Sequence, residues 1–400
     1  MKILWLTSQM VESGGGERFV FEVSNALNKI EGVEVYILTD AITEAALFKG
    51  KYSKENITIL TGNKSSRYNL IDHVFQKFLS LKKLRKEFNR IKPDILICQS
   101  EADSVRLNIT KFLSKTPIFL FNFGQMFQFL DDVSKYSFIF KSKIDKILKL
   151  QPDYAENINQ AIKLDPISWN LNELTSILKF FSVRSCSRVY TLSNQVIEEV
   201  KILYNKESFL LRGAISHEQI MKDSIRNPNN VSSNPNFLIV CRLHKKKRVD
   251  IILSAFLQSK SSGSLTIIGD GPEKANLEML SKASDSSKSI TFLSNISDND
   301  LFYQIKSCDY FISMDNSDFV ITAIEALACG RRLLLSEHFD LSSFDPALHG
   351  VKKIVPNEEN LAIFFDNPYV IEDPAEDNIL ALEKLTWNYV AEKILQDARE

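Results

Sequence analysis

The sequence has no long hydrophobic run and no excess of charge of either sign. Its first apolar run, within MKILWLTSQM at 1–10, is too short for a secretory signal or a membrane span, and no other segment reaches spanning length. The 49 basic residues almost balance the 50 acidic ones, so no overall field favours a nucleic-acid partner. We therefore expect a cytoplasmic protein that neither spans a membrane nor binds nucleic acid.

Cysteine and glycine are also scarce. The five cysteines are scattered without a CxxC pair, which disfavours a zinc site and indicates free, buried thiols in a reducing compartment. We therefore expect no metal site. The 13 glycines do not form the GxGxxG fingerprint of a dinucleotide-binding turn, and the acidic ribose ligand at the matching distance is missing too. A Rossmann dehydrogenase is therefore set aside.

What the chain does have is a regular alternation of strand-like runs and helical patterns. Its 400 residues, 44% of them hydrophobic, suffice for two domains. The alternation pauses in the polar, turn-rich RNPNNVSSNPN at 226–236 and then restarts. It predicts two parallel α/β domains, at 1–225 and 237–380, joined by a linker at 226–236. Strands are expected at 2–7, 33–39, 57–60, 94–98, 117–123, 188–193, 208–213, 237–243, 264–271, 289–293, 310–314, 332–336 and 351–356.

Ligands of open parallel sheets bind beyond the carboxyl ends of the strands, and two domains in series are expected to leave a cleft between them. SGGGERF at 13–19 places three glycines before a helix, where backbone amides favour an anion, although a merely flexible turn is equally compatible. CRLHKKKRVD at 241–250 brings Arg242 to a strand end and Lys247 to a helix start. Both are candidates for binding a diphosphate, with a solvated lysine run as the alternative.

Two more stretches follow strands in the second half of the chain. IIGDGPE at 267–273 is a strand, a tight turn and a proline at a first helical position, an arrangement that needs no ligand. SDFVITAIEALACG at 317–330 is an apolar helix with one carboxylate, Glu325, and a buried charge of this kind must be paired or hydrogen-bonded. Ribose hydroxyls are a suitable partner, and a structural salt bridge is the alternative.

In order and spacing, these stretches resemble the retaining family 4 glycosyltransferases, which have the GT-B fold. That family runs through GRLxxxKG, a GxGP turn and ExFGxxxxEAxAxG, which appear here as CRLHKKKRVD, GDGP and SDFVITAIEALACG. The likeness extends to SGGGERF, to SRVYTLSNQVIEEV at 187–200, and to LTWNYVAEKIL at 385–395. The resemblance implies two Rossmann-like α/β domains facing a cleft, with a closing helix at 381–400 that packs back on the N-terminal domain.

Carried over residue by residue, the resemblance implies that a nucleoside-diphosphate sugar binds the C-terminal domain and the acceptor binds the N-terminal domain. Arg242 and Lys247 would neutralise the departing diphosphate and Glu325 would bind the ribose, which makes these three the predicted catalytic residues. No metal or other cofactor is required by this arrangement. The predicted donor-binding residues are Gly15, Gly16, Asp318, Ile321, Thr322 and Glu325, and the predicted acceptor-side residues are Asn122 and Gln125.

The sequence departs from the family pattern at several positions. Ser317 stands where the family has the first of two glutamates eight positions apart, and Asp318 follows where the family has glycine. A serine cannot replace a carboxylate, so recognition of the donor sugar is the property most affected. The other departures are Cys241 and Arg248 in place of two glycines, Arg332 in place of a proline, and the lack of an acceptor-side histidine near Asn122 and Gln125.

Basic residues gather in two stretches of the first domain. FQKFLSLKKLRKEFNRIK at 75–92 has seven basic residues and a single acidic one, and KYSFIFKSKIDKILKL at 135–150 has five lysines. Both fit basic amphipathic helices on an anionic membrane surface, as a lipid-linked acceptor would require. Ordinary packing of one apolar face, with the lysines in water, is the alternative.

These observations leave three hypotheses for the function. The leading one is a cytoplasmic glycosyltransferase, membrane-associated at the inner face where the acceptor is lipid-linked, that moves a sugar to a hydroxyl of a glycan or lipid-linked glycan with retention of configuration. The second is a catalytically degenerate nucleotide-sugar-binding subunit that supports a partner transferase, which Ser317 favours. The third is a sugar-nucleotide epimerase of the same architecture, which the joint presence of the family 4 stretches disfavours.

Overall fold

The structure is a computed structural model, and the residues that it describes form two compact units. The first unit comprises 1–213 and 387–400, and the second comprises 214–386. Within the described residues, no helix is both long and apolar enough to cross a bilayer. The structure describes residues 1–10, 14–44, 46, 57–61, 70–122, 137–140, 143, 146, 166–217, 220, 234–283, 288–315, 319–337, 339–341, 344, 347–368, 371, 372, 374 and 377–400.

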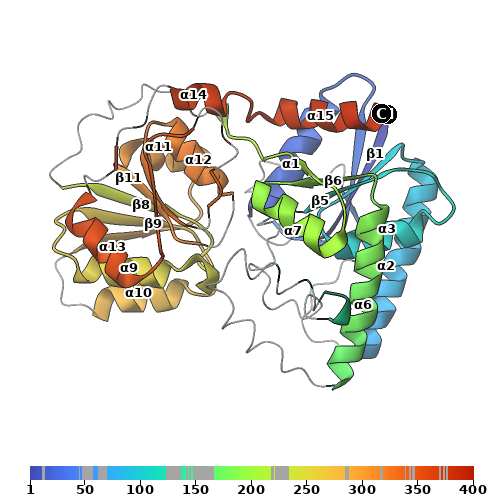
Figure 1. Ribbon diagram of the computed structural model, residues 1–400, viewed down its shortest axis with the longest axis horizontal. Helices are drawn as coiled ribbons and strands as arrows, with labels where there is room; N and C mark the ends of the chain where they lie inside the picture. Colours follow the sequence, from blue (N-terminus) through green and yellow to red (C-terminus); the bar gives the residue numbers. More distant parts are fainter. Residues whose placement is uncertain are drawn as a thin grey trace. The chain divides into compact units, whose positions relative to one another are not determined.

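The first unit is built on a parallel sheet of seven described strands, in the order β3-β2-β1-β4-β5-β6-β7 (Figure 1). Helices follow most of the strands, as parallel connections require. The elements are β1 (Lys2–Met10), α1 (Gly15–Asn28), β2 (Glu34–Ile42), β3 (Ile57–Ile59), α2 (Leu70–Ile91), β4 (Ile95–Cys98), α3 (Glu101–Thr110), β5 (Ile118–Asn122), α6 (Pro166–Ser185), β6 (Arg188–Thr191), α7 (Asn194–Tyr204), β7 (Phe209–Leu210) and α15 (Trp387–Arg399).

Both faces of this sheet are covered by helices, which explains why its strands are apolar throughout rather than alternating. Leu4 and Leu6 of β1 belong to a core cluster on one face, together with residues of α2, α3, α6 and α7. Ile3 and Trp5 point to the other face and pack with α1 and α15. The strands are therefore fixed from both sides, and their carboxyl ends are held at one edge.

The last helix of the chain belongs to the first unit. α15 packs against α1, as Figure 1 shows for the red helix at the end of the chain. Ile394 is fully buried in the core cluster, and the rings of Trp387 and Phe19 lie 5.8 Å apart. The Tyr190 hydroxyl donates to Asp397 at 2.6 Å. The predicted return of the closing helix to the N-terminal unit is thus confirmed.

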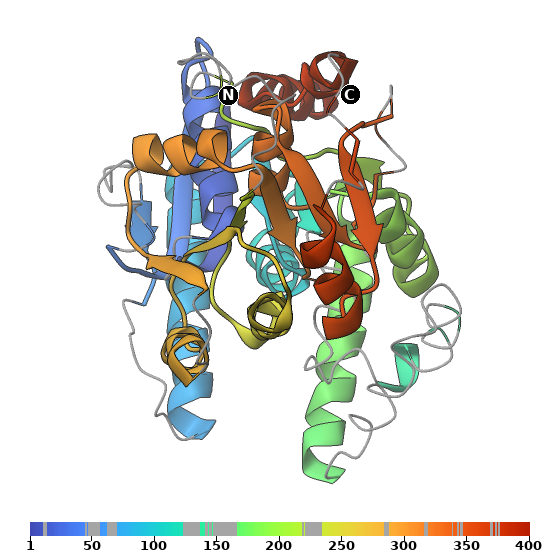
Figure 2. The same cartoon turned by 90° about the vertical axis from the view of Figure 1, so that its left-hand side faces the viewer.

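The second unit has a parallel sheet of six described strands, in the order β10-β9-β8-β11-β12-β13 (Figure 2). Its strands β8, β11 and β12 are the most deeply buried, and helices α9 and α13 pack together over one face. The elements are β8 (Asn236–Val240), the 3-10 turn η5 (Lys245–Lys247), α9 (Val249–Gln258), β9 (Ser264–Ile268), α10 (Lys274–Ala283), β10 (Ser289–Leu293), α11 (Asp298–Ser307), β11 (Tyr310–Ser313), α12 (Ile321–Ala328), β12 (Arg332–Ser336), β13 (Val351–Ile354), α13 (Glu358–Asp366) and α14 (Asp377–Leu382).

The predicted strands are confirmed at every position, with shifts of a few residues at their ends. One local prediction is wrong, because Lys247 does not begin a helix. It ends the short turn η5, and α9 begins at Val249. Between them, Arg248 has φ +54°, a left-handed conformation that an α-helix cannot include. The family 4 glycosyltransferases, which the sequence resembles, have glycine at this position, and glycine takes such a conformation without steric cost.

The units divide at 213/214 rather than in the 226–236 segment. The backbone N–H of Ile215 donates to the Leu385 carbonyl at 3.1 Å, and His217 Nε2 lies 3.1 Å from the same oxygen. Residues 214–217 are therefore tied to the second unit before the polar segment begins. Residues 221–233 lie outside the described residues.

Candidate functional site

Each sheet has one point where the strand order reverses. In the first unit this switch point lies between β1 and β4, and in the second unit between β8 and β11. In open α/β sheets, ligands bind beyond the carboxyl ends of the two strands that flank such a point. The residues that follow these four strands are therefore the first candidates for function.

The stretch that follows β8 is held in place by the turn after β9. Leu243 donates its backbone N–H to Asp270 O at 2.8 Å. A Cβ at Gly269 would lie 1.9 Å from Cys241 O, and one at Gly271 would lie 2.3 Å from Leu243 O. The two glycines are thus required by close backbone approach. The GDGP turn fixes the strand end that carries Arg242, and the packing alone accounts for it.

Arg242 and Lys247 lie at this switch point together with an acidic residue that the sequence analysis missed. Lys247 Nζ donates to Asp315, which follows β11. The Asp315 side chain is 5% exposed and that of Lys247 is 29% exposed, while Arg242 is exposed. Asp315 could have been found from the sequence, because it directly follows a predicted central strand.

Opposing effects set the pKa of Lys247. Burial lowers the pKa, but the charge and the hydrogen bond of Asp315 raise it by more, so the net shift is upward. The charge of Arg242 acts on the same ammonium and lowers its pKa. The carboxyl edge of β8 and β11 therefore carries the protonated Lys247 and the exposed guanidinium of Arg242.

Glu325 is fully buried in α12, with 0% of its surface exposed. Its Oε1 accepts a hydrogen bond from the Ser216 backbone N–H at 3.0 Å. The carboxylate thus ties the first residues of the second unit to α12 through a backbone amide. Ile321 and Thr322, both half-buried, form the first turn of this helix, and Ser317 and Asp318 lie outside the described residues.

At the switch point of the first unit, Gly15 and Gly16 begin α1. Both are exposed, and a Cβ at either position would meet no atom within 4 Å. Gln99 Nε2, beyond the end of β4, donates to the Gly16 carbonyl at 3.2 Å. The fold itself therefore does not require glycine at these two positions.

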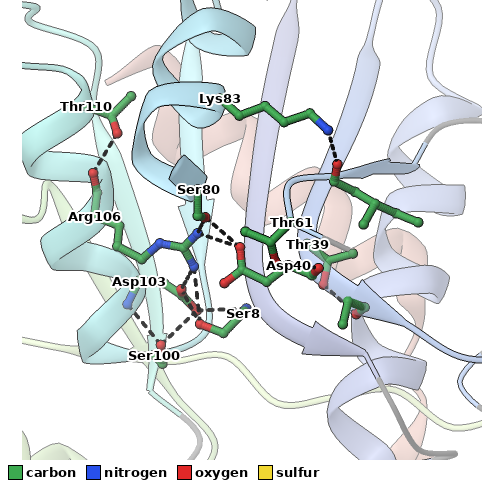
Figure 3. Close-up of polar contacts among 12 residues, drawn as sticks. Ser8, Thr39, Asp40, Thr61, Ser80, Lys83, Ser100, Asp103, Arg106 and Thr110 are labelled. Carbon is green, nitrogen blue, oxygen red and sulfur yellow. Dashed lines mark hydrogen bonds and ion pairs between the residues drawn. The ribbon is translucent and has the colours of Figure 1, made fainter. Parts of the chain in front are cut away.

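Next to this point lies a polar network that the sequence analysis did not identify (Figure 3). Arg106 Nη2 lies 2.9 Å from Asp40 Oδ1, and Arg106 Nη1 lies 3.1 Å from Asp103 Oδ1. Ser8 Oγ donates to Asp103 at 2.6 Å, and Ser80 Oγ donates to Asp40 at 2.6 Å. The network joins the carboxyl ends of β1 and β2 to α2 and α3.

Asp103 is the most enclosed member of this network, with a side chain that is 2% exposed. Burial raises its pKa, although Arg106 and the hydroxyls of Ser8 and Ser100 act in the opposite direction. Ser100 also caps α3 by accepting the backbone N–H of Asp103 at 3.0 Å. The network therefore closes the end of the core with groups that satisfy one another.

The predicted acceptor-side residues are only partly described. Asn122 is the last residue of β5 and is half-buried, and it pairs in register with Thr191 of β6. Gln125 lies outside the described residues. Asn122 is therefore at a carboxyl strand end, with one strand, β4, between it and the switch point.

All five cysteines are free thiols, and burial raises the pKa values of Cys186, Cys241 and Cys329 to about 12. They are therefore uncharged at neutral pH, which makes them poor nucleophiles and poor metal ligands. Among the described residues, no three His, Cys, Asp or Glu side chains gather as metal ligands. Independence from metal remains a prediction.

A comparison with protein families shows what this part of the chain is similar to. Residues 221–341 match the family model described as "Glycosyl transferases group 1", and the match contains Arg242, Lys247, Asp315 and Glu325. This stretch is similar to the group 1 glycosyl transferases. The resemblance to family 4 glycosyltransferases that the sequence predicted is thereby confirmed.

A curated relative extends the likeness without covering the chain. An uncharacterized glycosyltransferase of Haemophilus influenzae is 28% identical over 193 residues, which are 46% of this chain and 48% of that protein. The match thus spans about half the length of each. It is a likeness to a glycosyltransferase for the matched part only.

Solved structures match the whole chain at low identity. The lipopolysaccharide outer core galactosyltransferase WaaB, in its apo form, has a TM-score of 0.64 at 15% identity, with 99% of each chain covered. HepE from Anabaena, in complex with UDP-glucose, has a TM-score of 0.67 at 13% identity, covering 99% of this chain and 98% of that one. Sucrose-phosphate synthase from Thermosynechococcus elongatus has a TM-score of 0.71 at 14% identity, covering 100% and 98%.

These likenesses show the fold. The two parallel α/β sheets and the closing helix match GT-B structures, so the predicted fold class is confirmed. The stretch that matches the group 1 model contains the β8/β11 switch point with its two cations. Fold likeness does not decide the roles predicted for single residues.

Proposed function

We propose that the chain transfers a sugar from a nucleoside-diphosphate sugar to a hydroxyl acceptor, with retention of configuration. The observation that supports this best is the placing of Arg242 and Lys247, within the stretch that matches the group 1 model, at the carboxyl edge of its central strands. A diphosphate that departs from a sugar gains negative charge in the transition state, and fixed cations at that position lower the barrier. Asp315 keeps Lys247 protonated and oriented.

The donor is best sought first among UDP sugars, because two of the similar solved structures are complexes of HepE with UDP-glucose and with UDP and glucose. In this proposal, the diphosphate binds Arg242 and Lys247, and the amides at the start of α12 near Ile321 and Thr322 assist. Glu325 binds the ribose through its carboxylate while it keeps its contact to Ser216. The arrangement needs no metal.

On the acceptor side, Gly15 and Gly16 allow the backbone at the start of α1 to approach the bound molecules closely. Their exposure and the open space around them support this role. Asn122 and Gln125 remain the proposed polar contacts to the acceptor, which is a glycan or a lipid-linked glycan. The protein would act in the cytoplasm, at the inner membrane face where the acceptor is lipid-linked.

A product assay with matched variants tests the proposal. Lys247→Met should reduce transfer by at least about a hundredfold, in line with the loss of one charged transition-state contact. Lys353→Met, which removes an exposed lysine of β13, should leave transfer unchanged. Full transfer by Lys247→Met would refute the diphosphate site.

Glu325 needs a variant that separates its two roles. Glu325→Gln retains an acceptor for the Ser216 N–H but loses the carboxylate, so it should keep the thermal stability and lose most of the transfer. Glu325→Ala would in addition leave that amide unpaired. Transfer at the wild-type rate by Glu325→Gln would remove Glu325 from the site.

A second function has one observation in its favour. Ser317 stands where the family has a glutamate, which suits a catalytically degenerate subunit that binds the nucleotide sugar and supports a partner transferase. Such a subunit would bind the nucleotide without forming product. Nucleotide binding with no product from any acceptor, and product formation by Ser317→Glu, would favour this alternative.

A further inference from the structure

The helices on one face of the first unit form a layer whose outer surface is unusual. α3 contacts both α2 and α6. Leu84, Leu107 and Val183, one from each helix, lie in the same core cluster, so these three sides face the sheet. The opposite sides of the helices face solvent, where polar side chains are expected.

α6 instead carries an apolar stripe on its solvent side. The side chains of Leu174, Leu178 and Phe181 are 58%, 46% and 62% exposed. Their spacing of four and three residues places them on one side of the helix, away from the buried Val183. A helix that only packs on the core gains nothing from this stripe.

The turn after α3 continues the apolar surface. Phe112 is 68% exposed and Leu113 is 90% exposed, and both stand between Lys111 and Lys115. Asn108 Nδ2 donates to Ser182 Oγ at 2.7 Å, which pins this end of α3 to the end of α6. The turn and the stripe therefore belong to one surface.

The exposed charged side chains on this layer of helices are positive throughout the stretches described below. In the described stretches 78–91, 101–116 and 174–185, every exposed charged side chain is basic. The three carboxylates there, Glu87, Glu101 and Asp103, are half-buried or buried. The exposed basic residues are Lys82, Lys83, Arg85, Lys86, Arg90, Lys115 and Arg184. We call the outer surface formed by these basic residues, the stripe and the turn the basic apolar face.

This surface overlaps in part with the two stretches that the sequence suggested. In 75–92, Leu84 and Ile91 are buried and Phe88 packs on the core, so ordinary packing accounts for the apolar side of this helix from residue 81 onward. Of 135–150, Phe140 is fully buried and most of the rest lies outside the described residues. Exposed apolar groups come from α6 and the turn after α3, and also from the two predicted stretches, where Phe78, Leu79 and Phe138 are 63%, 38% and 80% exposed.

We propose that the basic apolar face docks the first unit on an anionic lipid bilayer. Phe112, Leu113 and Phe181 enter the interfacial region, and the basic residues of α2 lie over anionic headgroups. Bulky apolar side chains surrounded by lysine and arginine are the composition that binds such an interface. This inference is independent of sugar transfer.

The same composition argues against the other candidate partners. Nucleic acid would use the basic residues through its phosphates but would leave the stripe and the turn in water. A second copy of the chain would bring two basic surfaces together, and like charges across an interface oppose association. An anionic bilayer uses both the charge and the apolar side chains.

Flotation of the full chain with lipid vesicles tests the proposal. The protein should float with vesicles of phosphatidylcholine and phosphatidylglycerol and should not float with phosphatidylcholine alone. Phe112→Ser combined with Leu113→Ser should lower the ratio of bound to free protein by at least about tenfold. The matched control, Met279→Ser with Ile363→Ser, removes apolar groups that are 65% and 62% exposed in the second unit and should have no effect.

Charge is tested on the same vesicles. The triple variant Lys82→Gln, Arg85→Gln and Lys86→Gln should bind anionic vesicles more weakly, by roughly fivefold for each charge removed. Added salt should also weaken the binding. The control triple, Lys260→Gln, Lys282→Gln and Lys353→Gln, removes three exposed charges from the second unit and should bind as the wild type does. Unchanged melting temperatures verify that each variant is folded.

Several results would overturn the proposal. The proposal is wrong if the protein does not float with anionic vesicles. It is also wrong if the variant with the Phe112 and Leu113 substitutions floats as well as the wild type. Self-association of the wild type that Phe181→Ser abolishes would assign the face to a second copy of the chain. Binding of an RNA or DNA duplex without binding of vesicles would assign the face to nucleic acid.

Discussion

At the residue scale, both units hold a cation at the carboxyl edge by means of a buried carboxylate. Lys247 is paired with Asp315, and Arg106 is shared between Asp40 and Asp103. The two arrangements differ in what remains accessible. Arg106 is 16% exposed and bonded on two sides, as a structural group would be, whereas Lys247 is 29% exposed and lies beside the exposed Arg242.

Asp315→Asn should make nucleotide binding fail at a lower pH. Asp315 holds the pKa of Lys247 above its usual value, and without that charge the effect of burial remains and lowers the pKa. Lys247 is charged below its pKa, so binding is lost as the pH rises through that value. Affinity for a nucleoside diphosphate, measured from about pH 7 to pH 10, should decline earlier for the variant than for the wild type. Glu359→Gln, at an exposed position of α13, is the control, and identical profiles for all three proteins would contradict the pairing.

Asp103→Asn should remove one source of pH dependence from the stability. Burial raises the pKa of Asp103 above 3.8, so the folded state holds this proton more tightly than the unfolded state does. The free energy of unfolding should therefore fall as the pH rises from 3.8 through the folded pKa, with a slope of up to about 1.4 kcal/mol per pH unit. Denaturant titrations of the variant should lack this slope, and those of Asp250→Asn, an exposed position, should retain it.

At the scale of elements, the strands were predictable and the ends of helices were not. Strands buried on both faces are continuous apolar runs, so β8, β11 and β12 are visible in the sequence. The start of α9 is not, because it depends on Arg248 in a left-handed conformation. The pairing of Asp315 with Lys247 and of Arg106 with Asp40 is not visible either, because these partners are far apart along the chain and become neighbours only when the sheet forms. Glu325 was identified from its apolar surroundings, but its bond to Ser216 depends on where the second unit begins.

Two glycine substitutions should separate stability from function. Gly16 lies in the first turn of α1 with open space around it, so Gly16→Ala should leave stability unchanged or raise it by up to about 1 kcal/mol, while sugar transfer falls because a ligand can no longer approach the backbone.

Gly32 has φ +76°, so Gly32→Ala should cost about 1 kcal/mol of stability and leave transfer by the folded protein unchanged. Chemical denaturation and the product assay measure both effects. Equal transfer by Gly16→Ala and the wild type would refute the role of the α1 start.

At the scale of the whole molecule, the chain leaves its first unit, forms the second, and returns. The last 14 residues, 387–400, complete the core of the first unit rather than extending the second. The stability of the first unit therefore depends on the far end of the chain. Residues 1–213 cut out alone would leave that core open, because they lack α15.

Ile394→Ala in α15 should destabilise the first unit by about 2–5 kcal/mol, because the side chain is fully buried against α1 and the sheet. Glu392→Ala, at an exposed position of the same helix, should change stability by less than about 0.5 kcal/mol. Hydrogen exchange can assign the loss to a unit. Loss of protection in β8 and β11 with none in β1 would contradict the assignment of α15 to the first unit.

The central claim is that a nucleoside diphosphate binds the cations at the β8/β11 switch point. Calorimetric titration of UDP, GDP, ADP and CDP into the wild type, Lys247→Met and Lys353→Met tests it most directly. The account predicts that one nucleotide binds the wild type and Lys353→Met equally, and that Lys247→Met binds it at least about tenfold more weakly, since a charged contact contributes roughly 1.5–3 kcal/mol. Binding that Lys247→Met leaves unchanged, or no binding of any nucleotide by the wild type, would contradict it.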